Sequence, residues 1–576
     1  MIQTKTMQKI KYFKRATFIV FLFFLLTISD AKAINFSQVL DFNIDSDYDI
    51  GARSSISATL VKTTSKLYFY IEKNWWDSQV YAKQNEILNN LENLSQEFDN
   101  KIYPVLTSAF GSEWKPGIDG DERITLLFHL MKPDVGGYFR TTDEYLKLQL
   151  PDSNEREMVY LPIAQIDSPQ LKRFLAHEFV HLITFNQKDK IYGVSEETWL
   201  NEARAEYAPT LLGYDDIYDG SNLQKRVQYF LERPFDSVTE WLNKKYDYGS
   251  VNLFTQYLVD QYGVGILLDS LKLKSIGIQS INETLQRYNI KKDFSQIFTD
   301  WTIAIFLNDC SIKQEYCYFN KNLQSLKINP SLNFLPLVGK SSLSVTNVTK
   351  NWAGDWQKFI GGNGNLKLEF QGLAGLNFKV PYLVQDKDGK FSVNFLTLDK
   401  NQKGTITISN FGTQDKALVI IPSLQTKTSG FDGVEPTYPF TLIVTVSESG
   451  AAEEGAIKQL LDQIDFLQKE IAKVQAQINA ILGRNPPSCS SITENLYYGM
   501  QNNAQVRCLQ EFLKFQGTEI YPEGLVTGNF GNLTRLAVIR FQEKYASEIL
   551  TPLGLSRGTG VVGPRTLTKI NQLLTR

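Results

Sequence analysis

The chain has 576 residues, more than a single hydrophobic core usually organises, so several domains are expected. Hydrophobic residues make up 43% and aromatic residues 12% of the sequence, as in folded globular proteins. The 60 basic and 62 acidic residues leave a formal charge of -2, which excludes the strongly basic character typical of nucleic-acid-binding proteins.

The N-terminus has the three-part pattern of a secretory signal peptide. Basic residues between Lys5 and Arg15 precede an apolar run over 18–28, and Ala31 and Ala33 then form a small-x-small cleavage site. The apolar run is short for a membrane span, which favours cleavage over a retained anchor, the alternative interpretation. We therefore assign residues 1–33 to a signal peptide and expect a secreted or cell-surface protein.

Residues 34–325 mix strand and helix patterns, with strands in the first half and helices in the second. Apolar periodicity predicts strands at 66–71, 124–128 and 158–161 and helices at about 80–109, 250–262, 264–272 and 294–308. This order predicts an α+β domain, of which residues 34–100 could serve as a pro-region.

The strongest chemical signal lies on a helix that Ser168 can cap. His177 and His181 are four residues apart on one face of that helix, where two imidazoles can bind one zinc ion. Glu178 lies beside the same face and can reach a metal-bound water. The alternative is a surface helix with two satisfied histidines. Apolar neighbours and a total of only three histidines in the chain count against it.

A third ligand is expected downstream, where the sequence WLNEARAEYA over 199–208 has helical composition. Glu202 would complete a set of two histidines and one glutamate, which leaves zinc a fourth position for water. Glu206, one helical turn further on, could accept the outer ring N–H of His177 and fix its orientation. The alternative is that the two glutamates only solvate a helix.

The paired motifs HEFVH over 177–181 and NEARAE over 201–206 resemble those of the gluzincin metallopeptidases. Together with GGYF over 136–139 and YGSVNLF over 248–254, they are most similar to the hyicolysin-like secreted peptidases. That family usually has glycine where this chain has Ala203, a change that removes no ligand. The resemblance implies a zincin-type fold, one catalytic zinc ion, and a protein or peptide substrate.

The resemblance also implies a mechanism in which Glu178 acts as the general base toward a zinc-activated water. Tyr248 is the candidate donor to the developing negative charge, because related peptidases often place a tyrosine or histidine after the third ligand. Tyr246 is an equally placed neighbour, and an ordinary core tyrosine is the alternative for both. His129 lies in a strand pattern and is expected to be a core histidine.

Calcium is left open as a second cofactor. The segments Asp119-Gly-Asp121 and Asp215-Asp216 with Asp219 are rich in oxygen donors, but neither has the register of a known calcium loop. Turn chemistry explains both equally well.

Residues 330–449 have a different texture from the region before them. Short alternating strands are predicted between glycine, asparagine and aspartate residues, at 366–370, 376–380, 404–408, 417–421 and 440–446. This spacing predicts an all-β sandwich, to which the sequence assigns no chemistry.

A heptad pattern follows over 455–483. Isoleucines seven residues apart alternate with further apolar residues, which is typical of a coiled-coil helix and favours a parallel homodimer through 457–481. The alternative is a single helix that packs on its own domain. Gly483 and the prolines at 486 and 487 end the pattern, and residues 484–488 form a linker.

Residues 489–576 resemble the small helical peptidoglycan-binding domain. The resemblance rests on VRCLQ over 506–510, GNFG over 528–531 and a second glycine turn, GVVGPRT, over 560–566. Each glycine turn precedes a threonine near a helix start, which predicts a compact three-helix module. The resemblance implies peptidoglycan or the cell wall as a partner, although an insertion at about 545–558 departs from the short form.

The four cysteines form two pairs that are close in sequence, Cys310 with Cys317 and Cys489 with Cys508. In an oxidising compartment two local disulfides are the expected pairing. A cysteine–zinc site is the alternative, but neither pair has C-x-x-C spacing.

Together these features predict a secreted zinc endopeptidase held near the cell wall by its C-terminal domain. The alternatives are a hydrolase of peptidoglycan cross-links, which the C-terminal domain favours, and a non-catalytic cell-surface adhesion protein.

Overall fold

The computed structural model describes residues 38–447 except 134, 338 and 432, then residues 465–470, 473–474 and 487–574. The predicted signal peptide lies outside the described residues, as does most of the predicted coiled coil. Within the coiled-coil segment, residues 465–470 and 473–474 are helical. The homodimer predicted through 457–481 therefore stays a prediction.

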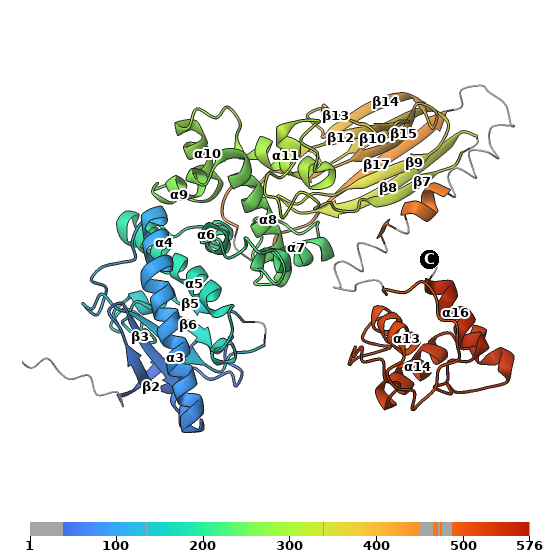
Figure 1. Ribbon diagram of the computed structural model, residues 1–576. Helices are drawn as coiled ribbons and strands as arrows, with labels where there is room; N and C mark the ends of the chain where they lie inside the picture. Colours follow the sequence, from blue (N-terminus) through green and yellow to red (C-terminus); the bar gives the residue numbers. More distant parts are fainter. Residues whose placement is uncertain are drawn as a thin grey trace, which may run out of the picture. The chain divides into compact units, whose positions relative to one another are not determined.

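The described chain is multidomain, with helices, β-sheets and a helical C-terminal domain (Figure 1). Residue contacts divide it into two compact units. Unit 1 contains residues up to Gln224, Thr255–Phe294 and Ser429–Asp432, and unit 2 contains Lys225–Phe254, Ser295–Thr428 and the chain from Gly433 onward.

Unit 1 contains a six-stranded sheet in the order β1-β2-β3-β4-β6-β5. Its strands are β1 (Val39–Asn43), β2 (Ser55–Thr63), β3 (Leu67–Glu72), β4 (Ile124–His129), β5 (Tyr138–Phe139) and β6 (Met158–Pro162). Strands β3, β4 and β6 run parallel, and β5 pairs with β6 in the antiparallel direction at the edge. Strands β3, β4 and β6 confirm the three strands predicted from the apolar pattern. They are almost wholly buried, as expected for continuous apolar runs in parallel strands.

Helices of unit 1 share one core with this sheet. Residues of α3, α4, α5 and α6 pack with residues of β3, β4 and β6 in one buried cluster. The helices of unit 1 are α2 (Lys73–Asp77), α3 (Tyr81–Glu97), α4 (Tyr103–Phe110), α5 (Leu171–Phe185), α6 (Thr198–Leu211), α9 (Gly265–Leu271) and α10 (Gly277–Arg287). The single helix predicted over 80–109 is divided into α3 and α4 by a π-helical turn at Phe98–Ile102, after which Pro104 occupies the first turn of α4.

Helix α5 begins later than its sequence indicates. It starts at Leu171, and no side chain caps it. The hydroxyl of Ser168 instead accepts a hydrogen bond from the backbone N–H of Gln170, in the turn before the helix. Eleven of the fifteen residues of α5 are buried, which is why its apolar periodicity was strong.

Unit 2 contains helical segments and a β-rich region. The helices α7 (Asn222–Glu232) and α8 (Lys245–Tyr262) lie partly in unit 2, and α11 (Phe294–Leu307) lies in it almost entirely. The disulfide between Cys310 and Cys317, which follows α11, forms as predicted.

The β-rich region confirms the predicted run of short strands. A nine-stranded sheet has the order β13-β12-β15-β14-β10-β17-β8, with β9 pairing β15 and β7 pairing β9, while β11 and β16 form a separate pair. The strands are β7 (Ser331–Leu335), β8 (Ser341–Thr349), β9 (Gln357–Gly361), β10 (Gly364–Gln371), β11 (Phe378–Lys379), β12 (Pro381–Asp386), β13 (Phe391–Phe395), β14 (Lys403–Phe411), β15 (Asp415–Ile420), β16 (Ser423–Leu424) and β17 (Tyr438–Ser447). Alternate residues of β10 and β17 are buried and meet residues of β9, β14 and β15 in one core.

The C-terminal domain is a small helical module with its own core. It contains α13 (Ala504–Phe515), α14 (Asn532–Lys544), α15 (Ala546–Ile549) and α16 (Pro564–Leu574). The short α15 lies within the predicted insertion, so the three-helix expectation holds for α13, α14 and α16.

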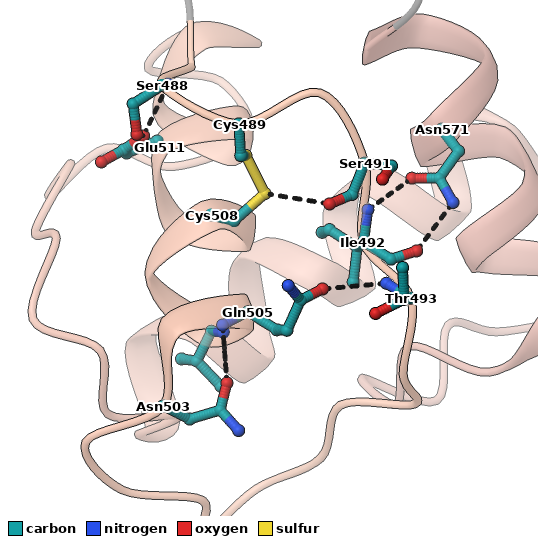
Figure 2. Close-up of a disulfide and its surroundings, with 11 residues drawn as sticks. Ser488, Cys489, Ser491, Ile492, Thr493, Asn503, Gln505, Cys508, Glu511 and Asn571 are labelled. Carbon is teal, nitrogen blue, oxygen red and sulfur yellow. Dashed lines mark hydrogen bonds between the residues drawn. A yellow bond between two sulfur atoms is a disulfide. The ribbon is translucent and has the colours of Figure 1, made fainter.

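A disulfide joins the start of this domain to α13. Cys489 bonds to Cys508, as predicted, and Asn503 caps α13 by accepting hydrogen bonds from the backbone N–H groups of Gln505 and Val506. The segment after Cys489 is also tied to α16, since Asn571 accepts from the backbone N–H of Ile492 (Figure 2). These contacts fix the entry of the chain into the domain.

Candidate metal centre

The two histidines of α5 and the first glutamate of α6 come together in unit 1. Nε2 of His177 lies 3.2 Å from Nε2 of His181. The Glu202 carboxylate lies 3.3 Å from Nε2 of His177 and 3.8 Å from Nε2 of His181. One ligand atom from each residue can be chosen so that all three lie within 4.8 Å of one another, and no other such group of three occurs among the described residues.

These distances fit the geometry of a small tetrahedral cation. Ligand atoms held about 2.0–2.1 Å from zinc at tetrahedral angles are about 3.3 Å apart. Oε2 of Glu202 is buried and faces Nε2 of His177 at 3.3 Å, so both atoms point to the place that a cation would take. The donor set of two imidazoles and one carboxylate therefore fits a zinc ion.

The outer nitrogen of each imidazole faces a side chain from α6. Nδ1 of His177 lies 3.3 Å from Oε1 of Glu206, and Nδ1 of His181 lies 3.0 Å from Oδ1 of Asn201. Acceptors at these positions hold Nδ1 as the protonated nitrogen and leave Nε2 free to bind a metal. Glu206 thus lies within reach of His177, and its role in orienting that ring stays a prediction. Asn201 was given no role from the sequence, although its position next to Glu202 in the WLNE motif was the available signal.

Burial and charge act in opposite directions on the two histidines. Burial lowers the pKa of His177, but its hydrogen bonds to Glu202 and Glu206 outweigh that effect and raise its pKa well above the usual value. Burial lowers the pKa of His181; the charge of Glu202 opposes that decrease without cancelling it, and the charge of His177 adds to it. The carboxylates of Glu202 and Glu206 thus stabilise positive charge beside the imidazole of His177.

Glu178 is buried beside the ligands. Burial raises its pKa to about 8, and the charges of Glu202 and Glu206 add to that increase while His177 opposes it. A divalent cation at the ligands would lower this pKa again. The carboxylate of Glu178 is thus buried, and its pKa depends on the charge at the neighbouring metal ligands.

The edge strand β5 runs close to Glu178. Gly137, just before β5, has φ of +156°, and a Cβ atom there would lie only 3.0 Å from both Cγ and Oε1 of Glu178. It would also lie 2.9 Å from the carbonyl oxygen of Tyr160. Glycine is therefore required for β5 to approach the site this closely.

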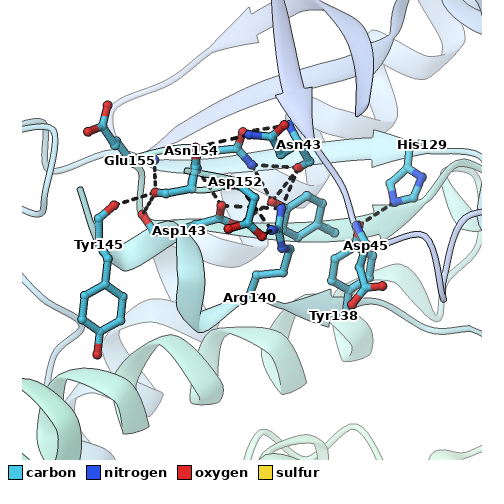
Figure 3. Close-up of polar contacts among 12 residues, drawn as sticks. Asn43, Asp45, His129, Tyr138, Arg140, Asp143, Tyr145, Asp152, Asn154 and Glu155 are labelled. Carbon is cyan, nitrogen blue, oxygen red and sulfur yellow. Dashed lines mark hydrogen bonds and ion pairs between the residues drawn. The ribbon is translucent and has the colours of Figure 1, made fainter. Parts of the chain in front are cut away.

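A buried polar network holds the chain on either side of β5 (Figure 3). Arg140 donates to the carbonyl of Asn43 and to the carboxylate of Asp152. Asp143 accepts from the backbone N–H of Asn154 and, over 2.5 Å, from the hydroxyl of Tyr160. These bonds leave β5 as a fixed edge next to Glu178.

His129 is a core histidine, as predicted. It is fully buried, with Nδ1 3.4 Å from Oδ2 of Asp49 and Nε2 3.1 Å from the hydroxyl of Tyr138. Burial lowers its pKa, although Asp49 opposes that decrease. Its ring therefore supports β4 and β5 in the neutral form.

The two tyrosine candidates are on α8, in the part of the chain assigned to unit 2. The hydroxyl of Tyr248 donates to Asn243, its ring packs against Trp241, and Arg226 lies over the ring. Because the metal ligands belong to unit 1, the role predicted for Tyr248 stays a prediction.

The two acidic segments considered for calcium have other partners. Asp121 pairs with Arg123 and accepts from the hydroxyl of Tyr68. Asp215 accepts from the hydroxyl of Thr210 and the backbone N–H of Leu223. Neither segment forms a metal-binding group of three among the described residues, so calcium gains no support.

Comparison with known families identifies the C-terminal domain. Residues 502–570 match a family model described as "Putative peptidoglycan binding domain".

Among the described residues, none of the helices has the length and apolar character needed to cross a membrane.

Part of the chain is similar to a known metalloprotease. This relative, ShpI of Staphylococcus hyicus, is described as a neutral metalloprotease and is 26% identical over 275 residues. The match covers 42% of this chain and 59% of the relative. The chain therefore spans less than two thirds of the protein that it resembles.

Two solved structures each match about a fifth of the chain. The pre-peptidase C-terminal domain of a Bacillus anthracis collagenase is 8% identical, with a TM-score of 0.14, and the match covers 20% of this chain and 96% of that domain. PliG of Aeromonas hydrophila, a periplasmic inhibitor of g-type lysozyme, is 10% identical with the same TM-score, over 20% of this chain and 98% of its own. TM-scores this low carry no argument about this chain.

Proposed function

We propose that the chain is a secreted zinc-dependent endopeptidase, with His177, His181 and Glu202 as the metal ligands. The observation that carries the proposal is the convergence of three ligand atoms from α5 and α6 beside the buried carboxylate of Glu178. The similarity to a neutral metalloprotease supports protein or peptide as the substrate class. A zincin-type fold for unit 1 is part of the same proposal, supported by its parallel strands and its two site helices.

Zinc bound at these ligands would polarise the scissile carbonyl and make a water molecule more acidic. Glu178 accepts the proton of the attacking water and passes it to the departing amine. Glu206 and Asn201 keep both imidazoles oriented while the charge at the site changes. The burial of Glu178 keeps bulk water away from its carboxylate.

Strand β5 supplies a site for an extended peptide. It is the last strand of its sheet, and its backbone lies beside Glu178. An extended chain added to such an edge is held by main-chain hydrogen bonds and selected by alternate side chains. This arrangement favours an endopeptidase, because it requires no free end of the substrate.

The C-terminal domain supports cell-wall attachment as a further part of the proposal. The family match at residues 502–570 favours a peptidoglycan ligand. The same match favours a second candidate function, hydrolysis of peptidoglycan cross-links by the same metal centre. The N-terminal signal pattern and the two disulfides support export.

The decisive measurement is zinc content and casein cleavage for the mature chain and for Glu178→Ala. We expect about one zinc ion per chain in both proteins, and a loss of cleavage of at least about 100-fold in the variant because the base is gone. Glu178→Gln should behave alike, and Glu86→Ala, at an exposed position, serves as the control. A mature chain without metal, or full cleavage by Glu178→Ala, would contradict the proposal.

A further inference from the structure

Helix α6 carries Glu202 and also the two side chains that face the imidazoles, Asn201 and Glu206. The position of its first turn therefore sets three of the groups that build the metal centre. No side chain caps this turn. Two buried glutamates that precede the helix, Glu196 and Glu197, anchor it instead.

Glu196 connects α6 to other parts of unit 1. Its carboxylate accepts from Nη1 of Arg204 at 2.7 Å and from the backbone N–H of Gly277 at 2.7 Å. Nζ of Lys188 lies 3.5 Å away. Arg204 is itself on α6, so this anchor lies within the core of unit 1.

Glu197 connects the helix to a segment from much further along the chain. Its Oε2 accepts from the indole N–H of Trp199 at 2.7 Å, and its Oε1 accepts from the backbone N–H of Gly430 at 2.8 Å. Its backbone carbonyl accepts from the N–H groups of Leu200 and Asn201 and so begins the helix. One residue thus links residue 430 to the residue that faces His181.

The segment around Gly430 is built to make this contact. Gly430 has φ of +71°, a conformation that glycine adopts without strain, and the next residue, Phe431, is 2% exposed. In sequence the segment lies between β16 and β17 of unit 2, yet Ser429–Asp432 packs as part of unit 1. The chain therefore enters unit 1 for a few residues, where one of them donates to Glu197.

We propose that residues 429–431 are a positioning element for the metal centre, acting through Glu197 on the start of α6. This inference rests on the proposed function, since it assumes that Glu202 binds zinc. In this role the segment acts on the start of α6 through Glu197. It holds the helix that presents Glu202 and Asn201, so its loss is expected to loosen the metal before it unfolds the chain.

The test is zinc release from the zinc-loaded, full-length mature chain to a chromogenic chelator, with Glu197→Gln as the variant. Trp199 and Gly430 donate to different oxygens of Glu197, and a glutamine in the same orientation puts an NH2 group in place of one of them, so one of the two acceptors is lost. We expect release to be about threefold faster or more, below the about 10–100-fold typical of residues that contact a ligand directly. Casein cleavage should fall at low free zinc and recover when zinc is added in excess.

A second pair of variants covers the case in which Glu197→Gln does not fold. Phe431→Ala removes the buried ring without altering Glu197 and should also speed zinc release. Phe431→Leu keeps a large apolar side chain and should release zinc at close to the wild-type rate. The matched control is Glu240→Gln. Glu240 is fully buried and accepts from the backbone N–H of Glu435, further along the same connection, within unit 2.

The outcomes separate the two proposals. Unchanged zinc release in both Glu197→Gln and Phe431→Ala would overturn the positioning role while leaving the metal centre intact. Equally fast release from Glu240→Gln would overturn it as well, because the effect would then be general loss of stability. A wild-type chain that binds no zinc would overturn the proposed function and this inference together.

Discussion

At the scale of single residues, charge and burial determine which side chains can do chemistry. Unit 1 buries several carboxylates, but they differ in their partners. Glu196 is paired with Arg204 at 2.7 Å, whereas the carboxylate of Glu202 faces the imidazoles of His177 and His181. A buried carboxylate with a cationic partner is structural, whereas one that faces two imidazoles is suited to a metal.

Glu144 and Glu157 form a third kind of buried carboxylate site. Both are less than 4% exposed, and three of their four oxygens have no hydrogen-bond partner. Burial raises the pKa of Glu157 to about 7, with the charge of Asp119 adding, and burial together with the charge of Glu157 raises the pKa of Glu144 well above its usual value. The folded state therefore binds protons that the unfolded state releases.

This pair predicts a loss of stability as the pH rises. Because the folded pKa of Glu157 exceeds its unfolded value, its contribution to stability is present at low pH and disappears as the pH approaches about 7 and above. Glu157→Gln should reduce the loss of unfolding free energy between low and high pH by about 1–3 kcal/mol. The amide of the glutamine can donate to Glu144, and its oxygen still accepts from the backbone N–H of Ile118. Thermal unfolding at about pH 5 and about pH 8, with Glu86→Gln as the control, checks it. A variant that keeps the full wild-type pH dependence would contradict this explanation.

At the scale of elements, the C-terminal domain uses the same device twice. Gln510 on α13 is buried; its Oε1 accepts from the backbone N–H groups of Thr527 and Gly528, and its Nε2 donates to Thr534. Gln542 on α14 accepts from the N–H of Gly560 and donates to Thr566 in the same way. Each glutamine thus closes a glycine turn onto the helix that follows it.

Gln510→Ala should destabilise this domain by about 2–4 kcal/mol, because it leaves buried N–H groups without an acceptor. The exposed Gln501→Ala is the control and should change little. Calorimetry of the full chain should show a lower transition temperature for the C-terminal domain only. An unchanged transition would mean that the turn does not depend on the glutamine.

At the scale of the whole molecule, the proposed peptidase and wall-binding functions reside in separate parts of the chain. The metal ligands lie in unit 1, and the family match lies at residues 502–570. Binding to the wall would raise the effective concentration of the peptidase near wall-linked substrates without altering its site.

Sedimentation with purified sacculi tests this division of labour. The full mature chain should sediment with the sacculi, and a chain that lacks residues 487–576 should stay in solution while it still cleaves casein. Equal sedimentation of both chains would exclude the C-terminal domain as the wall anchor. Soluble peptidoglycan fragments released by the wild type, but not by Glu178→Ala, would favour the cross-link hydrolase instead.

Features that depend on local spacing could be predicted from the amino-acid sequence. The positions of His177 and His181 follow from helical periodicity, and the order of strands and helices follows from apolar patterning. Both disulfides joined cysteines that are close in sequence. Each of these depends on residues within a few turns of one another, so the chain's local pattern was sufficient.

Which residues far apart in the sequence come into contact is seen only in the folded structure. It placed Asn201 against His181 and Gly430 against Glu197, across a gap that no periodicity encodes. It also buried Glu144 and Glu157 together, from the two ends of the connection between β5 and β6. Such contacts depend on how whole elements pack, and packing is decided by the burial of the entire core rather than by any one motif.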